Sequence, residues 1–119
     1  MKILVVDDNA GLAAVLKLML EDEGFDVASA KDGEDGYSEY LLFRPDIVIT
    51  DIQMPVKTGI ELMGLIRGHD PKVKIICMSA DMSRFQSILN EEKEKHQVCL
   101  LEKPFSRDKL MELLFQFAC

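Results

Sequence analysis

The sequence is short of positive charge, of cysteine and of long apolar stretches, and each shortage excludes a class of protein. Its 119 residues include 14 lysines and arginines against 21 aspartates and glutamates, for a formal net charge of −7, whereas direct binding of nucleic acid needs a basic surface. No apolar run approaches the length of a membrane span, and the N-terminal run turns acidic at Asp7, too soon for a signal peptide. We therefore expect a cytoplasmic protein with neither a nucleic-acid nor a membrane partner.

The cysteines point to the same compartment. Cys77, Cys99 and Cys119 are odd in number and have no C-x-x-C spacing, so a disulfide framework is not expected. Cys77 and Cys99 lie within apolar runs, which predicts buried free thiols in a reducing environment.

Five short apolar runs alternate along the chain with five segments of helical periodicity. The central run, 47–49, is β-branched and uncharged, which is typical of a strand buried on both faces, whereas 25–27 alternates as an edge strand does. The alternation predicts one domain over residues 1–119, an α/β fold with a five-stranded parallel sheet and helices on both faces. The expected strands are 3–6, 25–30, 47–51, 73–78 and 98–101, and the expected helices begin at Asn9, Asp32, Thr58, near Phe85 and at Ser106.

Several helix ends can also be predicted. Asn9, Thr58 and Ser106 are typical N-cap residues. Gly24 is expected to end the first helix, because glycine is favoured just beyond a helix C-terminus. Gly68 and Pro71 are expected to end the third, which would leave His69 in a loop.

Polar residues follow four of the five predicted strands. The strand 3–6 is followed by Asp7 and Asp8, the central strand ends at Asp51, and the last two strands lead into Ser79 and Lys103. The carboxyl ends of parallel strands share one edge of a sheet, so these groups should converge. If the strand order is 2-1-3-4-5, the first and third strands are neighbours whose connections leave in opposite directions, which opens a crevice between them.

Such a cluster suits phosphoryl chemistry assisted by a divalent cation. Three carboxylates at close range repel one another, and a hard cation such as Mg²⁺ relieves that repulsion. One carboxylate could attack phosphorus and form an acyl phosphate, while Lys103 and Ser79 offset charge on the transferred oxygens. Each residue alone has a plainer explanation as a cap, a turn former or a solvated charge. Their joint placement at four strand ends favours a functional site.

Motifs of a known family occur in order along the chain: Val-Val-Asp-Asp-Asn at 5–9, Pro-Asp-Ile-Val-Ile-Thr-Asp-Ile-Gln-Met-Pro at 45–55, Gly59, Ser79-Ala80 and Glu-Lys-Pro-Phe at 102–105. Together they resemble the receiver domain of two-component response regulators over essentially the whole chain. The resemblance implies a flavodoxin-like (βα)5 fold with strand order 2-1-3-4-5. It also implies that Asp51 accepts a phosphoryl group from a histidine-kinase phosphohistidine, with Mg²⁺ required.

The resemblance also implies a role for each site residue. Asp8 and Asp51 would bind the metal directly, Asp7 through water, and Gln53 through its backbone carbonyl. Ser79 matches the hydroxyl that bonds the phosphoryl group, Lys103 the phosphoryl-binding lysine in a cis Lys103-Pro104 peptide, and Ala80 the small residue that leaves the site open. Such a domain catalyses its own phosphorylation and dephosphorylation, but it is a signalling module.

One position departs from the family pattern, and two others leave the lifetime of the phosphoryl group unpredicted. The position at which the family often has a switching aromatic residue is Leu100, which puts the usual hydroxyl–aromatic switch in doubt. Gln53 and Asp81 occupy positions that tune the phosphoryl lifetime in the family, in a direction that the sequence does not predict.

The implied partners are a sensor histidine kinase or phosphotransfer protein and a downstream protein or effector domain. The resemblance places the downstream contact, or a homodimer contact, on the face formed by the helix near Phe85, the strand 98–101 and the last helix. A stand-alone receiver and a piece of a longer regulator both fit the sequence.

Other functions remain open. A Mg²⁺-dependent phosphohydrolase of the haloacid-dehalogenase or Toprim kind would need Asp-x-Asp spacing, and a flavin carrier would need a Ser/Thr/Gly-rich phosphate loop after the first strand. The last alternative is an interaction module that works without phosphorylation.

Overall fold

The computed structural model describes all residues of the chain except 55, 82, 84–86, 88–89, 91–97 and 119. Five strands form one parallel sheet in the order β2-β1-β3-β4-β5, which confirms the predicted flavodoxin-like α/β topology. The strands are β1 (Lys2–Val6), β2 (Asp26–Ala30), β3 (Ile47–Asp51), β4 (Lys74–Ser79) and β5 (Val98–Glu102). The helices of the described residues are α1 (Ala10–Asp22), α2 (Gly33–Phe43), α3 (Gly59–His69) and α5 (Arg107–Ala118). The helix predicted near Phe85 lies outside the described residues.

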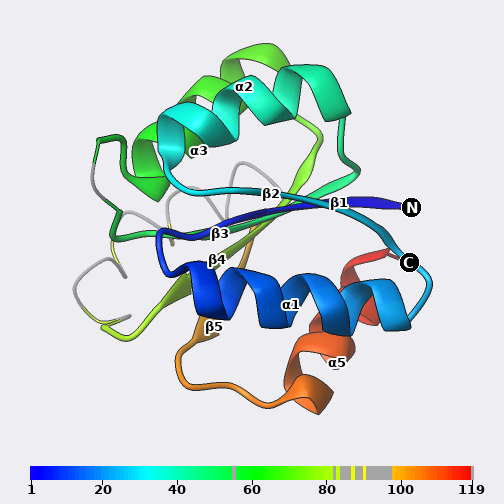
Figure 1. The fold of residues 1–119 in the computed structure, drawn as a ribbon. Coiled ribbons are helices and arrows are strands. Elements are labelled where there is room, and N and C mark those ends of the chain that lie inside the picture. Colours follow the sequence, from blue (N-terminus) through cyan, green and yellow to red (C-terminus); the bar gives the residue numbers. More distant parts are fainter. Residues whose placement is uncertain (55, 82, 84–86, 88–89, 91–97, 119) are drawn as a thin grey trace.

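Helices cover both faces of the sheet, with α2 and α3 on one side and α1 and α5 on the other (Figure 1). Strand β1 shows how the sheet serves two cores at once. Leu4 and Val6 belong to the apolar cluster that includes α2 and α3, whereas Ile3 and Val5 belong to the cluster that includes α1 and α5. Side chains alternate between the two faces of a strand, so a strand buried on both faces must be apolar throughout. This explains the uninterrupted apolar run at the start of the chain.

The helices begin where their capping residues predict. The Asn9 side chain accepts a hydrogen bond from the Leu12 backbone N–H at the start of α1. Thr58 and Glu61 form a reciprocal capping box at the start of α3, which satisfies two backbone donors that the helix itself cannot. Beyond the end of α1, Gly24 has φ +93°, the left-handed region that glycine enters without steric cost.

The end of α3 differs from the prediction. The helix continues through Gly68 and ends at His69, so Gly68 does not end it and His69 is not a loop residue. Glycine within a helix costs only about 1 kcal/mol relative to alanine. The His69 ring packs edge-on against the Tyr40 ring of α2, with 5.7 Å between centroids. This contact helps to offset the cost of the glycine.

Burial of the remaining strands departs from the sequence pattern in two places. Strand β2 is an edge strand, as predicted, but it does not have a single wet face. Val27 packs into the core that includes α1 and α5, and Ala30 into the core that includes α2 and α3, so both faces of β2 are partly covered by helices. Cys77 is buried and Cys99 is only partly buried, because Cys99 lies on the edge strand β5; neither cysteine forms a disulfide within the described residues. Cys119 lies outside the described residues. Within the part of the chain that the structure describes, no helix combines the length and apolar character needed to cross a bilayer.

Candidate functional site

The register of the sheet brings the predicted site residues to one edge. Val6 of β1 is paired with Thr50 of β3, so Asp7, which follows β1, lies level with Asp51, the last residue of β3. On the other side, Asp51 is paired with Met78, so Ser79 stands one residue further along β4. Ser79 in turn is paired with Glu102, and Lys103 follows directly. The strand ends therefore place the site residues side by side, as the sequence predicts.

Three carboxylates form the acidic part of this site. Asp7, Asp8 and Asp51 each offer a carboxylate oxygen, and these oxygens lie within 4.8 Å of one another. Asp7 and Asp51 are buried whereas Asp8 is exposed, so the cluster is open to solvent on one side. The Asn9 backbone N–H donates to Asp7 Oδ1 at 2.9 Å and orients that carboxylate. A compact, partly buried set of carboxylate oxygens fits a hard divalent cation such as Mg²⁺.

Lys103 brings a positive charge to the same place from the far end of the chain. Its Nζ donates to Asp7 Oδ2 at 3.1 Å and lies 3.3 Å from Asp51 Oδ2. Burial alone would lower the pKa of Lys103, but the hydrogen bond to Asp7 and the charges of Asp51 and Asp7 outweigh it and raise that pKa. The ammonium group is therefore held in its charged form between two carboxylates. The Lys103-Pro104 peptide bond is cis, as the family resemblance implies.

Asp51 is the carboxylate with the perturbed acidity. Burial raises its pKa and the nearby Asp7 charge adds to that rise, while the charge of Lys103 and hydrogen bonds from Lys103 and the Gln53 backbone N–H oppose it. The net result is a raised pKa. Burial therefore makes the ionised form of the Asp51 carboxylate costly, which marks this group as a candidate functional carboxylate.

Ser79 and its neighbours form the third side of the site. The Ser79 side chain is buried, and its Oγ accepts a hydrogen bond from the Asp81 backbone N–H at 3.0 Å. Ala80 is exposed, so it leaves that side of the site open. Leu100 is partly buried in β5, paired with Cys77, and packs against the core beneath α2 and α3. The sequence predicts that Ser79 and Ala80 lie along this edge of the sheet. It does not predict that the Ser79 hydroxyl accepts a hydrogen bond from the Asp81 backbone N–H.

Two glycines, Gly33 and Gly59, hold the loop between β3 and α3 against its neighbours, and no sequence pattern predicts the contact of Gly33. The Gly33 N–H, at the start of α2, donates to the Lys57 carbonyl at 3.1 Å. The Gly59 N–H donates to the Ile52 carbonyl at 2.9 Å, and a Cβ atom on Gly59 would lie 2.2 Å from the Asp51 carbonyl oxygen. Gly59 belongs to the family motif, which is the only signal that could have drawn attention to it.

An apolar hollow of about 470 Å³ adjoins the site. Lys103 and Ala80 border it on the side of the carboxylates. Val15, which projects from α1, is 51% exposed. The residues that line the hollow come from α1 and from the segments after β4 and β5: Leu12, Val15, Met19, Ala80, Lys103, Pro104 and Phe105.

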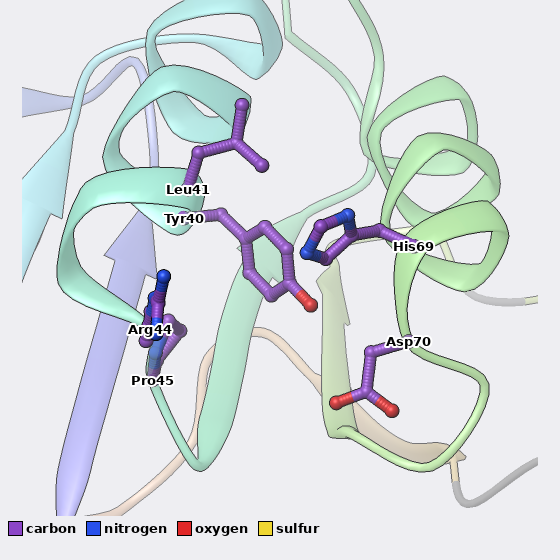
Figure 2. A pocket seen from close by; sticks show the side chains of 6 residues that line it. All are labelled: Tyr40, Leu41, Arg44, Pro45, His69 and Asp70. Carbon is purple, nitrogen blue, oxygen red and sulfur yellow. The ribbon is translucent and has the colours of Figure 1, made fainter.

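A second cavity, also of about 470 Å³, lies between the C-terminal ends of α2 and α3 (Figure 2). The chain enters β3 and β4 from these helix ends, so this cavity is at the opposite edge of the sheet from the carboxylates. The Tyr40 hydroxyl points between His69 and Asp70 in Figure 2. Burial and the Asp70 charge raise the pKa of Tyr40. The position of this cavity separates it from the carboxylate site.

Comparison with known proteins identifies one family. A family model for the response regulator receiver domain matches residues 3–115. Protein CcdB of Bacillus subtilis (strain 168) is 38% identical over 112 residues, which cover 93% of this chain and 92% of that protein.

Solved structures agree with the family match. The chemotaxis protein CheY4 of Vibrio cholerae superposes with a TM-score of 0.88 at 28% identity, covering 98% of this chain and 97% of that one. The response regulator TrrA of Thermotoga maritima, solved in complex with Mg²⁺ and BeF, gives a TM-score of 0.84 at 32% identity, with the same coverage.

Proposed function

The chain belongs to the response regulator receiver domain family, and on that basis we propose that Asp51 accepts the phosphoryl group on which its signalling depends. The donor is a phosphohistidine of a sensor histidine kinase or of a phosphotransfer protein, and residues 1–119 act as one receiver domain. The observation that carries the proposal is the convergence of Asp7, Asp51 and Lys103, with Lys103 Nζ within 3.3 Å of a carboxylate oxygen of each. Proteins of this family act in two-component signalling as modules that accept a phosphoryl group.

The proposed step is an in-line displacement at phosphorus. An oxygen of the Asp51 carboxylate attacks the phosphorus atom, a P–O bond forms as the P–N bond of the phosphohistidine breaks, and the departing imidazole nitrogen keeps the electron pair and takes a proton from solvent. Lys103 then offsets negative charge on the phosphoryl oxygens, and the Ser79 hydroxyl donates a hydrogen bond to one of them. Attack of water on the same phosphorus atom later returns Asp51 to the free carboxylate.

The acidic cluster supports a role for Mg²⁺ in this step. Asp8 and Asp51 would hold the ion directly, Asp7 through water and Gln53 through its backbone carbonyl. When bound, the ion supplies positive charge that relieves carboxylate repulsion and stabilises the phosphoryl oxygens. The likeness to TrrA, which was solved with Mg²⁺ and BeF, supports this assignment.

Two surfaces are proposed for partners. A kinase or phosphotransfer protein must bring its phosphohistidine to Asp51, and the apolar hollow bordered by Val15 and Lys103 offers a contact surface directly beside the site. For the downstream protein or effector domain, or for a second copy in a homodimer, we propose the face that includes β5 and α5. Phe115 on α5 is 56% exposed, which supports a contact role for that helix.

Phosphorylation by a small donor tests the assignment of Asp51. Incubation with acetyl phosphate and Mg²⁺ should add one phosphoryl group, measured by intact-protein mass spectrometry. Asp51→Asn should abolish the addition because the neutral amide oxygen is a far weaker nucleophile than a carboxylate oxygen, whereas Asp26→Asn, on the exposed edge strand, should leave it unchanged. Addition that persists in Asp51→Asn would refute the assignment. Rapid turnover of a small phosphate ester by the unmodified protein would favour the phosphohydrolase alternative instead.

A further inference from the structure

The first residue of α2 touches the loop that leads from β3 to α3. The Gly33 N–H donates to the Lys57 carbonyl at 3.1 Å. A Cβ atom built on Gly33 would lie 2.2 Å from the Lys57 carbonyl oxygen and 2.8 Å from the Lys57 carbonyl carbon. These atoms belong to the backbone, so they can make room only if the whole loop moves. Any side chain at position 33 would therefore displace the loop.

Backbone conformation does not explain the glycine at position 33. Gly33 is outside the left-handed region, the only region in which glycine is strongly favoured by its dihedral angles. The first turn of a helix accepts most residues, and Asp32 already caps α2 by accepting the Asp35 N–H at 2.8 Å. What requires glycine here is the close approach of Lys57.

The loop that Gly33 contacts is held in a strained conformation. Val56 has φ +68°, a region that β-branched residues rarely adopt, and its side chain is 72% exposed. Such a conformation persists only where neighbouring contacts impose it. The hydrogen bond from Gly33 fixes the Lys57 carbonyl directly after Val56, and the capping box fixes Thr58. The start of α2 is thus one of the contacts that hold this segment in place.

The other end of the loop belongs to the carboxylate site. The Gly59 N–H donates to the Ile52 carbonyl at 2.9 Å, between Asp51 and Gln53, and a Cβ atom on Gly59 would lie 2.2 Å from the Asp51 carbonyl oxygen. A shift of the loop at Lys57 therefore reaches the segment that carries Asp51 and Gln53. We propose that Gly33 is a positioning residue for the divalent-metal site, acting through Lys57 on the placement of the Asp51 carboxylate and the Gln53 carbonyl. This inference rests on the proposed function, because it presumes that the cluster binds Mg²⁺.

Metal affinity measured without phosphorylation tests the proposal. Gly33→Ala should weaken Mg²⁺ binding at least about tenfold, the lower end for loss of a group that orients metal ligands. Isothermal titration calorimetry with MgCl₂ on the unphosphorylated protein measures the affinity. In the metal-free protein, the amide of residue 33 should also exchange with solvent faster than in the unmodified protein, because its acceptor has moved. Gly64→Ala is the matched control, since a Cβ atom there meets nothing within 4 Å, and its Mg²⁺ affinity should be unchanged.

A second pair of variants perturbs the loop from its own side and covers the case in which Gly33→Ala does not fold. Val56→Pro fixes φ near −65°, so it cannot keep the present loop conformation, and it should also weaken Mg²⁺ binding. Val56→Gly permits φ +68° at no steric cost and should retain the affinity. Unchanged Mg²⁺ affinity in folded Gly33→Ala, or in Val56→Pro, would overturn the role of Gly33 while leaving the proposed function intact. Failure of the unmodified protein to bind Mg²⁺ would instead overturn the proposed function.

Discussion

Replacing Lys103 with methionine should destabilise the metal-free protein at neutral pH. Lys103 Nζ lies 3.1 Å from an Asp7 oxygen and 3.3 Å from an Asp51 oxygen, so each attraction is worth about 5 kcal/mol before desolvation at an effective dielectric constant of about 20. The cost of burying the charges cancels much of this, and removal of one partner from a buried pair typically costs about 3–5 kcal/mol. The Lys103 side chain is 20% exposed. We therefore expect Lys103→Met to lower the free energy of unfolding by about 3 kcal/mol, the lower end of this range.

The sign of the pH dependence follows from the two raised pKa values. The Lys103 pKa is raised in the folded protein, so its stabilisation is fully present below the unfolded-chain value of about 10.4 and is complete at pH 7. Without Lys103 the buried carboxylates repel each other, and protonation of Asp51, whose pKa is already raised, relieves that repulsion. The difference in free energy of unfolding between Lys103→Met and the unmodified protein should therefore shrink as the pH falls towards 4.

Urea unfolding followed by circular dichroism measures the difference at pH 7 and at lower pH, in EDTA and then in Mg²⁺. Added Mg²⁺ should reduce the loss, because the cation replaces the missing positive charge. Lys109→Met, on the exposed side of α5, is the matched control and should change stability by less than about 0.5 kcal/mol. A loss in Lys103→Met no larger than in the control, or a loss that does not depend on pH, would refute the electrostatic reasoning.

Two further substitutions test the site and the helix pair. Asp51→Asn should raise the free energy of unfolding of the metal-free protein at pH 7: the raised pKa means that ionisation of Asp51 costs stability as the pH rises through the folded value. The gain should vanish at low pH, and a destabilised Asp51→Asn in EDTA at pH 7 would contradict this account. His69→Ala should lower the free energy of unfolding by about 1 kcal/mol, because it removes an edge-to-face ring contact with Tyr40. An unchanged urea midpoint in His69→Ala would show that the contact contributes nothing.

Local pattern was sufficient to predict the sheet and the position of the site along its edge. The apolar run 47–49 predicts a strand buried on both faces, and β3 is buried throughout. Once the strands were placed, the parallel arrangement brought Asp7, Asp51 and Lys103 to one edge without any knowledge of side-chain contacts. This part of the prediction succeeded because strand periodicity and the carboxyl-edge rule depend only on short stretches of sequence.

The features that the sequence did not predict all depend on contacts between distant segments. His69 lies in a helix rather than a loop, and a ring on another helix packs against it. The left-handed conformation of Val56 and the close approach of Lys57 to Gly33 arise where the loop between β3 and α3 meets the start of α2. Cys99 is only partly buried because of its place on an edge strand, which depends on the order of the strands in the sheet. Local propensity carries no information on such approaches.

The apolar character of β1 on both faces raises the question of what fixes its alignment. In a strand with one wet face, a slip by one residue would expose the core side chains, which makes the slip costly. Here a slip would exchange one set of apolar side chains for another. Polar groups at the two ends of β1 must therefore set its register. Lys2 and Asp46 exchange hydrogen bonds at one end, and the Asp7 N–H donates to the Ala30 carbonyl at the other. The apolar interior of β1 stabilises the sheet but does not determine its register. The hydrogen bonds at the two ends of β1 determine the register, and with it the position of Asp7 relative to Asp51 and Lys103.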